Sequence, residues 1–184
     1  MLDKDTLLHL LREKEIPFIC EHHQPVFTML EWDKLGLSLD GTICKNLLLQ
    51  DKDGRYFHVV TTATKSLNLT AAAETLGSKR LSFASEDTLF SLLGIRTGSL
   101  SPLALVNDEA LRIRIVIDAQ LASEPTFLLH PLENTATVAL RNHDLMSFLS
   151  SIEHPPLWVS LKGRGATDRD AVTDVNRARS CKIR

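Results

Sequence analysis

The pattern of apolar and polar positions predicts a helix at the start of the chain, followed by an extended segment. Four leucines between residues 7 and 11 form an apolar stripe, Asp5 offers an N-cap, and Pro17 ends the pattern. Residues 16–20 then have the character of a short strand. A second helix is predicted over residues 28–35, because Thr28 can cap it and a glycine follows.

The strongest strand signal is a hairpin in the first third of the chain. Apolar runs over residues 42–50 and 55–61 flank the sequence Asp51-Lys52-Asp53-Gly54. An Asp-Gly pair tolerates the positive backbone angles that a tight turn requires. The pattern therefore predicts two antiparallel strands.

The rest of the chain alternates short helices with strands. Residues 69–76 and 85–93 are each followed by a glycine, as short helices often are, and residues 80–84 fit a small strand between them. Further strands are predicted over residues 111–117, 126–130 and 135–140, and a last helix over residues 142–152, capped by Asn142. Hairpins and meanders with helices between them favour an α+β domain with one curved sheet over a doubly wound parallel sheet.

Composition places the chain among folded, water-soluble proteins. Of its 184 residues 43% are hydrophobic and 24% charged, which excludes a disordered polyelectrolyte. No apolar run is long enough to span a bilayer and no basic-then-apolar leader opens the chain, so we expect a cytoplasmic protein without membrane contact. The three cysteines are scattered, which favours neither a disulfide framework nor a zinc site.

Charge divides the chain into an acidic body and a basic tail. Residues 1–161 carry 14 Lys and Arg against 20 Asp and Glu, a net charge of −6, whereas residues 162–184 carry 7 against 3, a net charge of +4. We therefore expect a folded domain over 1–161 and a C-terminal tail over 162–184. Such a tail can contact a polyanion, although a solvated terminus is the commoner explanation.

Sequence motifs of common enzyme classes are absent. The chain has no P-loop, no dinucleotide fingerprint, no Gly-x-Ser-x-Gly elbow and no His-Glu-x-x-His motif. His22 and His23 are adjacent, and neighbours in an extended segment point in opposite directions, so no metal site is expected. What remains is a set of polar features in apolar surroundings: Lys45-Asn46, residues 98–102, Asp118, His130-Pro131 and Asn134-Thr135.

Four segments, residues 44–49, 79–85, 97–102 and 130–138, resemble in their order the YbaK/prolyl-tRNA-synthetase-associated domain. Among its branches they are most similar to the free-standing bacterial proteins that hydrolyse Ala-tRNA(Pro). The resemblance covers about residues 5–158. It implies an α+β fold with a curved mixed sheet, partly barrel-like and flanked by helices. It also implies that no metal or organic cofactor is needed. The implied partners are the acceptor end of tRNA(Pro) and, as a further candidate, prolyl-tRNA synthetase.

The resemblance also assigns roles to single positions. Lys45 matches the essential lysine of the family, residues 98–102 its Gly-x-x-x-Pro loop, and His130 a histidine that lines the aminoacyl pocket. Asp118 matches an acidic position at the end of a strand. The catalytic set expected on this basis is Lys45, Gly98 and His130, and the substrate-binding set is Asn46, Ser99, Ser101, Pro102, Asp118, Asn134 and Thr135.

Elementary chemistry offers each position two interpretations. A protonated Lys45 can hold a phosphate or carbonyl oxygen, or its stem can lie along the sheet with its head in water. The Gly98 loop can direct backbone N–H groups at an oxyanion, or form an ordinary turn. His130 can bind the substrate or be a structural histidine, and Asp118 can attract the aminoacyl ammonium or cap the end of its strand.

The function expected from these residues is removal of the amino acid from mischarged tRNA. No activated serine or cysteine nucleophile is evident, which favours direct attack of water on the ester. The resemblance adds that the 2'-hydroxyl of the terminal ribose helps to activate this water. Two alternatives stay open: a deacylase for tRNA charged with serine or cysteine, and a module that binds tRNA or a synthetase without chemistry.

Overall fold

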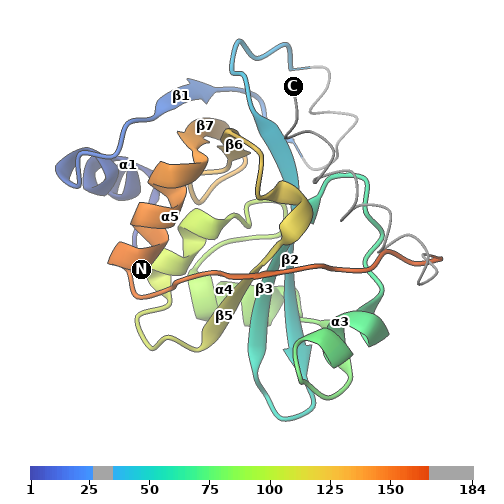
Figure 1. Cartoon of the computed structure of the whole chain (residues 1–184). Coiled ribbons are helices and arrows are strands. Elements are labelled where there is room, and N and C mark those ends of the chain that lie inside the picture. Colours follow the sequence, from blue (N-terminus) through green and yellow to red (C-terminus); the bar gives the residue numbers. More distant parts are fainter. Residues whose placement is uncertain (27–34, 166–184) are drawn as a thin grey trace, which may run out of the picture.

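The computed structural model describes residues 1–26 and 35–165 (Figure 1). The predicted helix over residues 28–35 therefore lies almost wholly outside the described residues, as does most of the basic tail. The helices are α1 (Lys4–Glu13), α3 (Leu69–Thr75), α4 (Glu86–Leu93) and α5 (Asn142–Ser151), with short 3-10 helices η1 (Pro102–Asn107) and η2 (Ala119–Leu121). The strands are β1 (Ile19–His22), β2 (Thr42–Asp51), β3 (Tyr56–Thr62), β4 (Leu81–Phe83), β5 (Ile113–Asp118), β6 (Thr126–Leu129), β7 (Ala136–Arg141) and β8 (Leu157–Val159).

The strands form one open mixed sheet, which confirms the α+β class. Their order is β1-β7-β6-β2-β3-β5-β8, and β4 pairs with β2 beside this path. β2 is antiparallel to β3 and β4 but parallel to β6, and β3, β5 and β8 run parallel to one another. Since the parallel pairs bring strand ends from distant parts of the chain together, polar residues at those ends can share one site.

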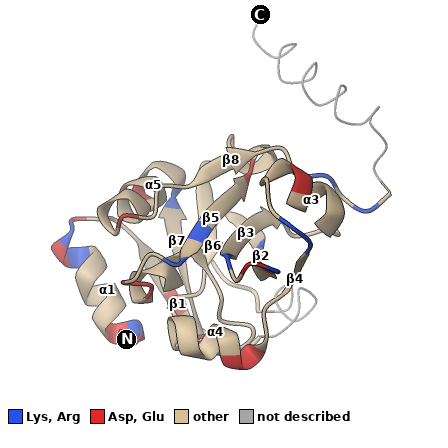
Figure 2. Ribbon diagram, turned by 90° about the horizontal axis from the view of Figure 1, so that it is seen from below, with Lys and Arg blue, Asp and Glu red and all other residues tan. Residues whose placement is uncertain are grey.

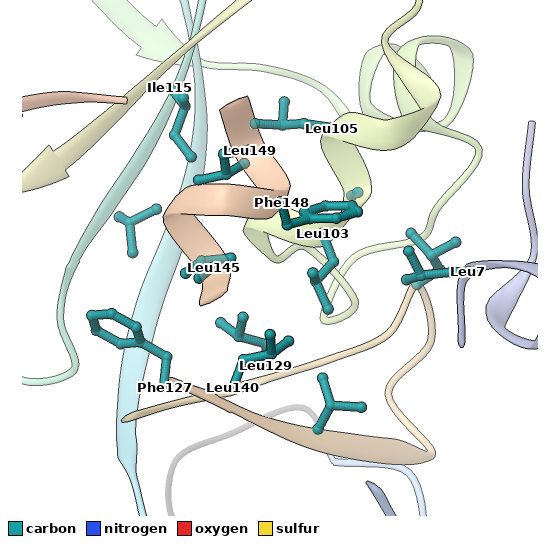
Figure 3. Close-up of a cluster of buried hydrophobic side chains, with 14 of the residues drawn as sticks. Leu7, Leu103, Leu105, Ile115, Phe127, Leu129, Leu140, Leu145, Phe148 and Leu149 are labelled. Carbon is teal, nitrogen blue, oxygen red and sulfur yellow. The ribbon is translucent and has the colours of Figure 1, made fainter. Parts of the chain in front are cut away.

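Two apolar clusters lie on opposite faces of the sheet. The larger joins α1, α4, η1 and α5 to one face, and Figure 3 shows Phe148 and Leu149 of α5 next to Leu103 and Leu105 of η1. The smaller cluster packs α3 on the other face, against Leu49 and other residues of β2, β3 and β5. Side chains alternate between the two faces along β2, because successive residues of a strand point in opposite directions.

The predicted hairpin and glycine stops are confirmed, but several element ends differ from prediction. The N-cap of α1 is Asp3, whose carboxylate accepts from the Thr6 N–H at 2.9 Å, instead of Asp5. The extended segment lies at Ile19–His22 because it pairs with β7 there, and not at residues 16–20. Asn142 is the first residue of α5, and its amide donates to the Glu124 carbonyl at 3.0 Å instead of capping the helix.

The C-terminal segment stays packed on the body beyond Leu161. The strand β8 pairs with the end of β5. The sequence does not predict it, because three residues after two prolines show little pattern of their own. The Lys162 carbonyl then accepts from the Asn68 N–H at 3.0 Å, and the Arg164 N–H donates to the Ser66 carbonyl at 2.7 Å. No helix in the described ranges is long and apolar enough to cross a membrane.

A fully buried histidine on β3 predicts loss of stability in acid. Burial lowers the pKa of His58 to about 3, whereas an unfolded histidine titrates near 6.5. Between these pH values the unfolded chain binds more protons, so the free energy of unfolding falls as the pH drops. We expect denaturant titrations to show a weaker fall below pH 6.5 for His58→Gln than for the wild type. The exposed His9→Gln change should leave the slope as it is, and identical slopes for all three proteins would contradict the role of His58.

Candidate functional site

Lys45 lies near the start of β2 on the face opposite the larger core. Its neighbour Cys44 is buried in that core, and Lys45 pairs in register with the buried Thr61 of β3. The Lys45 ammonium donates to the backbone carbonyl of Lys65 at 2.6 Å. Lys45 is therefore held against the loop that follows β3, and its head does not simply extend into water.

A second lysine ties this loop to the ends of two other strands. Lys65 Nζ lies 2.6 Å from Asp118 Oδ2 and 2.6 Å from the Leu161 carbonyl oxygen. Thr61 Oγ1 donates to the same Asp118 oxygen at 2.6 Å, while Asp118 Oδ1 accepts from the Gln120 N–H at 3.3 Å. The side chain of Asp118 is wholly buried. In this arrangement Asp118 anchors the loop that carries the partner of Lys45, and it also caps η2.

His130 comes directly after β6, and Lys45 lies near the start of β2, which pairs in parallel with β6. The pairs are Thr42↔Phe127 and Ile43↔Leu128, so Lys45 and His130 each lie two residues beyond the second pair. Since Cys44 and Leu129 both point into the larger core, their neighbours Lys45 and His130 are directed to the other face. Two residues that the resemblance names therefore lie on one face of the sheet, and a direct contact between them stays a prediction.

The chemistry of the His130 ring is set by burial. Burial lowers the pKa of His130, and the nearby His23 adds to this effect. The ring is therefore neutral at neutral pH. His130 Nδ1 lies 2.9 Å from the Ala136 carbonyl, which can only accept, so Nδ1 carries the proton and Nε2 the lone pair. The ring centroids of His130 and His23 are 5.9 Å apart.

The glycine loop reaches the same region through a serine. Ser101 Oγ donates to the His130 carbonyl at 2.6 Å, and both Ser99 and Ser101 are buried. Gly98 has φ of 90°, a conformation that disfavours other residues, and Pro102 begins η1. The loop is therefore fixed next to His130, and its Ser99 N–H donates to the Arg96 carbonyl at 3.1 Å.

The remaining predicted residues lie at differing distances from this centre. Asn134 bonds to the backbone of Val26, with its amide donating at 3.0 Å, and Thr135 Oγ1 donates to the Glu133 carboxylate at 2.6 Å. Asn46 lies on the side of β2 opposite to Lys45, where its oxygen lies 3.1 Å from His58 Nε2. The structure therefore does not bring the Asn46 side chain together with Lys45.

Nucleophilic and metal chemistry find little support in the part of the chain that the structure describes. Burial raises the pKa of the Cys44 thiol to about 12, so it stays protonated, and it points away from Lys45. No group of three or more metal-ligating side chains occurs within residues 1–26 and 35–165. A cation such as the Lys45 ammonium can instead hold a carbonyl or phosphate oxygen.

Comparison with known proteins decides the family. A family model described as the aminoacyl-tRNA editing domain matches residues 23–148. The chain belongs to this family of editing domains. It is 35% identical over 143 residues to the prolyl-tRNA editing protein ProX of Acetoanaerobium sticklandii, covering 77% of this chain and 87% of the relative. It is 33% identical over 159 residues to the prolyl-tRNA synthetase associated domain-containing protein 1 of Danio rerio, covering 85% and 86%.

Solved structures share the fold of this editing domain at low sequence identity. One, a hypothetical protein, matches with a TM-score of 0.67 and 20% identity over 86% of this chain and 99% of the other. Another, a candidate trans-editing enzyme for prolyl-tRNA synthetase, matches with a TM-score of 0.63 and 14% identity over 88% and 98%. At these identities the likeness shows the fold alone.

Three residues of the editing domain's candidate site were missed by sequence reasoning. Thr61 lies near the end of β3 and Lys65 three residues after that strand ends, and a lysine shortly after a buried strand was the available signal. His23 was considered only as a metal ligand. Its Nδ1 lies 2.8 Å from the Gln24 carbonyl and its Nε2 2.8 Å from Thr137 Oγ1. Nothing in a single sequence links His23 to His130, because the pairing of β1 with β7 brings them together.

Proposed function

We propose that this editing domain acts in trans as a deacylase of mischarged tRNA, with Ala-tRNA(Pro) as its substrate. The observation that supports the proposal is the hydrogen bond from Ser101 of the Gly98 loop to the His130 carbonyl, after a strand that pairs with the start of β2, where Lys45 lies. The names of the relatives, one a prolyl-tRNA editing protein and the other a prolyl-tRNA synthetase associated domain-containing protein, support the choice of tRNA. The acceptor end of tRNA(Pro) is then the binding partner, and prolyl-tRNA synthetase is a further proposed partner. The proposal also places the protein in the cytoplasm.

The proposed reaction is direct hydrolysis of the aminoacyl ester. The Lys45 ammonium and the N–H groups of the Gly98 loop stabilise the negative charge that develops on the ester oxygen when water attacks. The bond from the carbonyl carbon to the ribose oxygen breaks, and the ribose oxygen leaves as a hydroxyl after it takes up a proton. The 2'-hydroxyl of the terminal ribose would orient the attacking water. No covalent enzyme intermediate is needed, in keeping with the raised pKa of Cys44.

We expect His130→Ala to change which amino acid is released more than it changes stability. In the proposed complex, the Nε2 lone pair of this neutral ring accepts a hydrogen bond from the amino group of the aminoacyl moiety. The measurement is the ratio of alanine to serine or glycine released from the same tRNA, read beside the melting temperature. An unchanged ratio together with a large fall in melting temperature would instead make His130 a structural residue.

A panel of charged tRNAs separates the proposed function from its alternatives. Purified protein is incubated with tRNA carrying alanine, serine or cysteine, and free amino acid is measured over time. Preferred release of alanine supports the proposal. Preferred release of serine or cysteine would assign another substrate, and tight binding without release would make the domain a binding module.

A further inference from the structure

A basic hollow lies at the edge of the sheet, at the opposite end of β3 and β5 from Thr61 and Asp118. β8 pairs only with the last three residues of β5, so it leaves the first half of that strand uncovered. Figure 2, which views the molecule from below, shows basic segments near the labels of β2, β3 and β5. The polar side chains that line the hollow include Arg55, Arg112, Arg114, Glu153 and His154.

The three arginines line the hollow from β3, β5 and the residues just before them. β3 and β5 pair in parallel with Phe57 opposite Arg114, and one pair earlier Tyr56 lies opposite Ile113. Arg55 and Arg112 come one residue before this pair, just outside the two strands. Both line the same hollow as Arg114, so the three arginine side chains surround one space. Like charges in such positions destabilise a sheet unless an anion lies between them.

Carboxylates inside the protein neutralise only part of this charge. Arg55 is held by Asp51, whose Oδ2 lies 2.7 Å from both Nε and Nη2. Arg112 Nε lies 3.9 Å from Asp108, beyond hydrogen-bond distance, and Arg114 has no carboxylate partner within residues 1–26 and 35–165.

The Asp108 carboxylate already serves other groups. Its Oδ2 accepts from the Ile113 N–H at 2.7 Å and lies 3.2 Å from His154 Nε2. Glu153 is the one acidic side chain among the described residues of the lining. Both partners of Asp108 contact its Oδ2, whereas Arg112 faces Oδ1 at 3.9 Å without a hydrogen bond. The Arg114 guanidinium, together with the remaining N–H donors of Arg112, can therefore bind an outside anion.

We propose that this hollow binds a backbone phosphate of the tRNA whose aminoacyl end lies at Lys45. Guanidinium groups bind phosphate oxygens through paired N–H donors. Along the strand, four residue steps of about 3.3 Å separate Arg114 from Asp118. Across the sheet, two strand spacings of about 4.8 Å separate Asp118 from Lys45, so the diagonal from Arg114 to Lys45 is roughly 16 Å. A stacked nucleic-acid strand rises about 3.4 Å per nucleotide, so the phosphate lies about five nucleotides from the ester. This inference rests on the proposed function for its choice of RNA.

The test compares the full-length wild type with Arg112→Gln/Arg114→Gln in binding uncharged tRNA(Pro). We expect the dissociation constant of the variant to rise about five- to tenfold near 0.15 M salt. The slope of the logarithm of the dissociation constant against the logarithm of salt concentration should also fall by about 1 to 2 in the variant. The matched control, Arg12→Gln/Lys14→Gln on α1, removes the same charge and should bind nearly as the wild type does.

Further readouts separate failure of the hollow from failure of the proposed function. Single-turnover release of alanine at saturating protein should stay within about twofold of wild type in the Arg112/Arg114 variant, because phosphate contacts position the RNA and do not take part in the chemistry. Unchanged tRNA affinity and salt dependence would overturn the inference even if the wild type is an active deacylase. Loss of inorganic phosphate binding with full retention of tRNA binding would also overturn it. Absence of deacylation in the wild type would count against the proposed function, while the binding measurement would still decide the hollow.

Discussion

Replacing Lys45 with alanine should lower the rate of deacylation by about a hundredfold or more. The ammonium is held at 2.6 Å from the Lys65 carbonyl, on the face of the sheet to which His130 is also directed, and we propose that an ester oxygen acquires charge there. Loss of one preorganised group that stabilises such charge typically costs this much in rate. Because Lys45 lies outside the larger core, its removal should leave the fold intact. The measurement is the single-turnover rate on Ala-tRNA(Pro) at saturating protein.

Two further variants make the Lys45 result specific. Lys45→Met keeps the aliphatic stem and removes the charge, so it should be as slow as Lys45→Ala. Lys14→Ala removes an exposed lysine at the end of α1 and should react at the wild-type rate. A folded Lys45→Ala protein with near-normal turnover would show that the site has been placed wrongly.

Replacing Asp118 with alanine should be the most destabilising of the changes considered. Its carboxylate is fully buried and bonds to Thr61, Lys65 and the Gln120 N–H. Removing one partner of a buried ion pair leaves the other charge uncompensated, at a cost of about 3 to 5 kcal/mol. We expect the free energy of unfolding, measured by urea titration, to fall by this order.

An exposed ion pair provides the control for Asp118. Asp53 and Lys79 lie 2.8 Å apart with side chains 44% and 66% exposed, and such pairs contribute about 0 to 1 kcal/mol. Lys79→Ala, which breaks this pair without altering the hairpin turn, should therefore change stability little. Equal effects of Asp118→Ala and Lys79→Ala would mean that the buried carboxylate does not anchor the loop after β3.

The parts of the fold that the sequence predicted are those with strong local signals. The hairpin depends on Asp53-Gly54, where Gly54 has φ of 80°, and α4 begins at its Ser85 cap and ends before Gly94, with φ of 68°. Such features are decided within a few residues, so a single sequence reveals them. β8 and the shifted β1 instead exist through pairing with distant strands, which no local pattern contains.

The same distinction between local signals and distant contacts applies to the candidate site. Resemblance to a family, and not periodicity, singled out Lys45, Gly98 and His130. The pairing of β2 with β6, which no local pattern contains, then places Lys45 and His130 on neighbouring strands or just beyond them. Lys65 escaped notice because its role comes from Asp118 and Leu161, which are 53 and 96 residues away in the chain. For Asp118 the structure displays the bonds of a strand-end cap, and a contact with substrate stays a prediction.

The most direct test of the central claim compares Ala-tRNA(Pro) with Pro-tRNA(Pro) as substrates of the wild-type protein. A pocket that admits alanine can reject the larger proline ring by steric exclusion, whereas it gains only about 1 to 3 kcal/mol per methylene from binding. Single-turnover hydrolysis at saturating protein should release free alanine rapidly and leave Pro-tRNA(Pro) largely intact. Rapid hydrolysis of Pro-tRNA(Pro), or no release of alanine at all, would contradict the assignment of this domain as an editing deacylase.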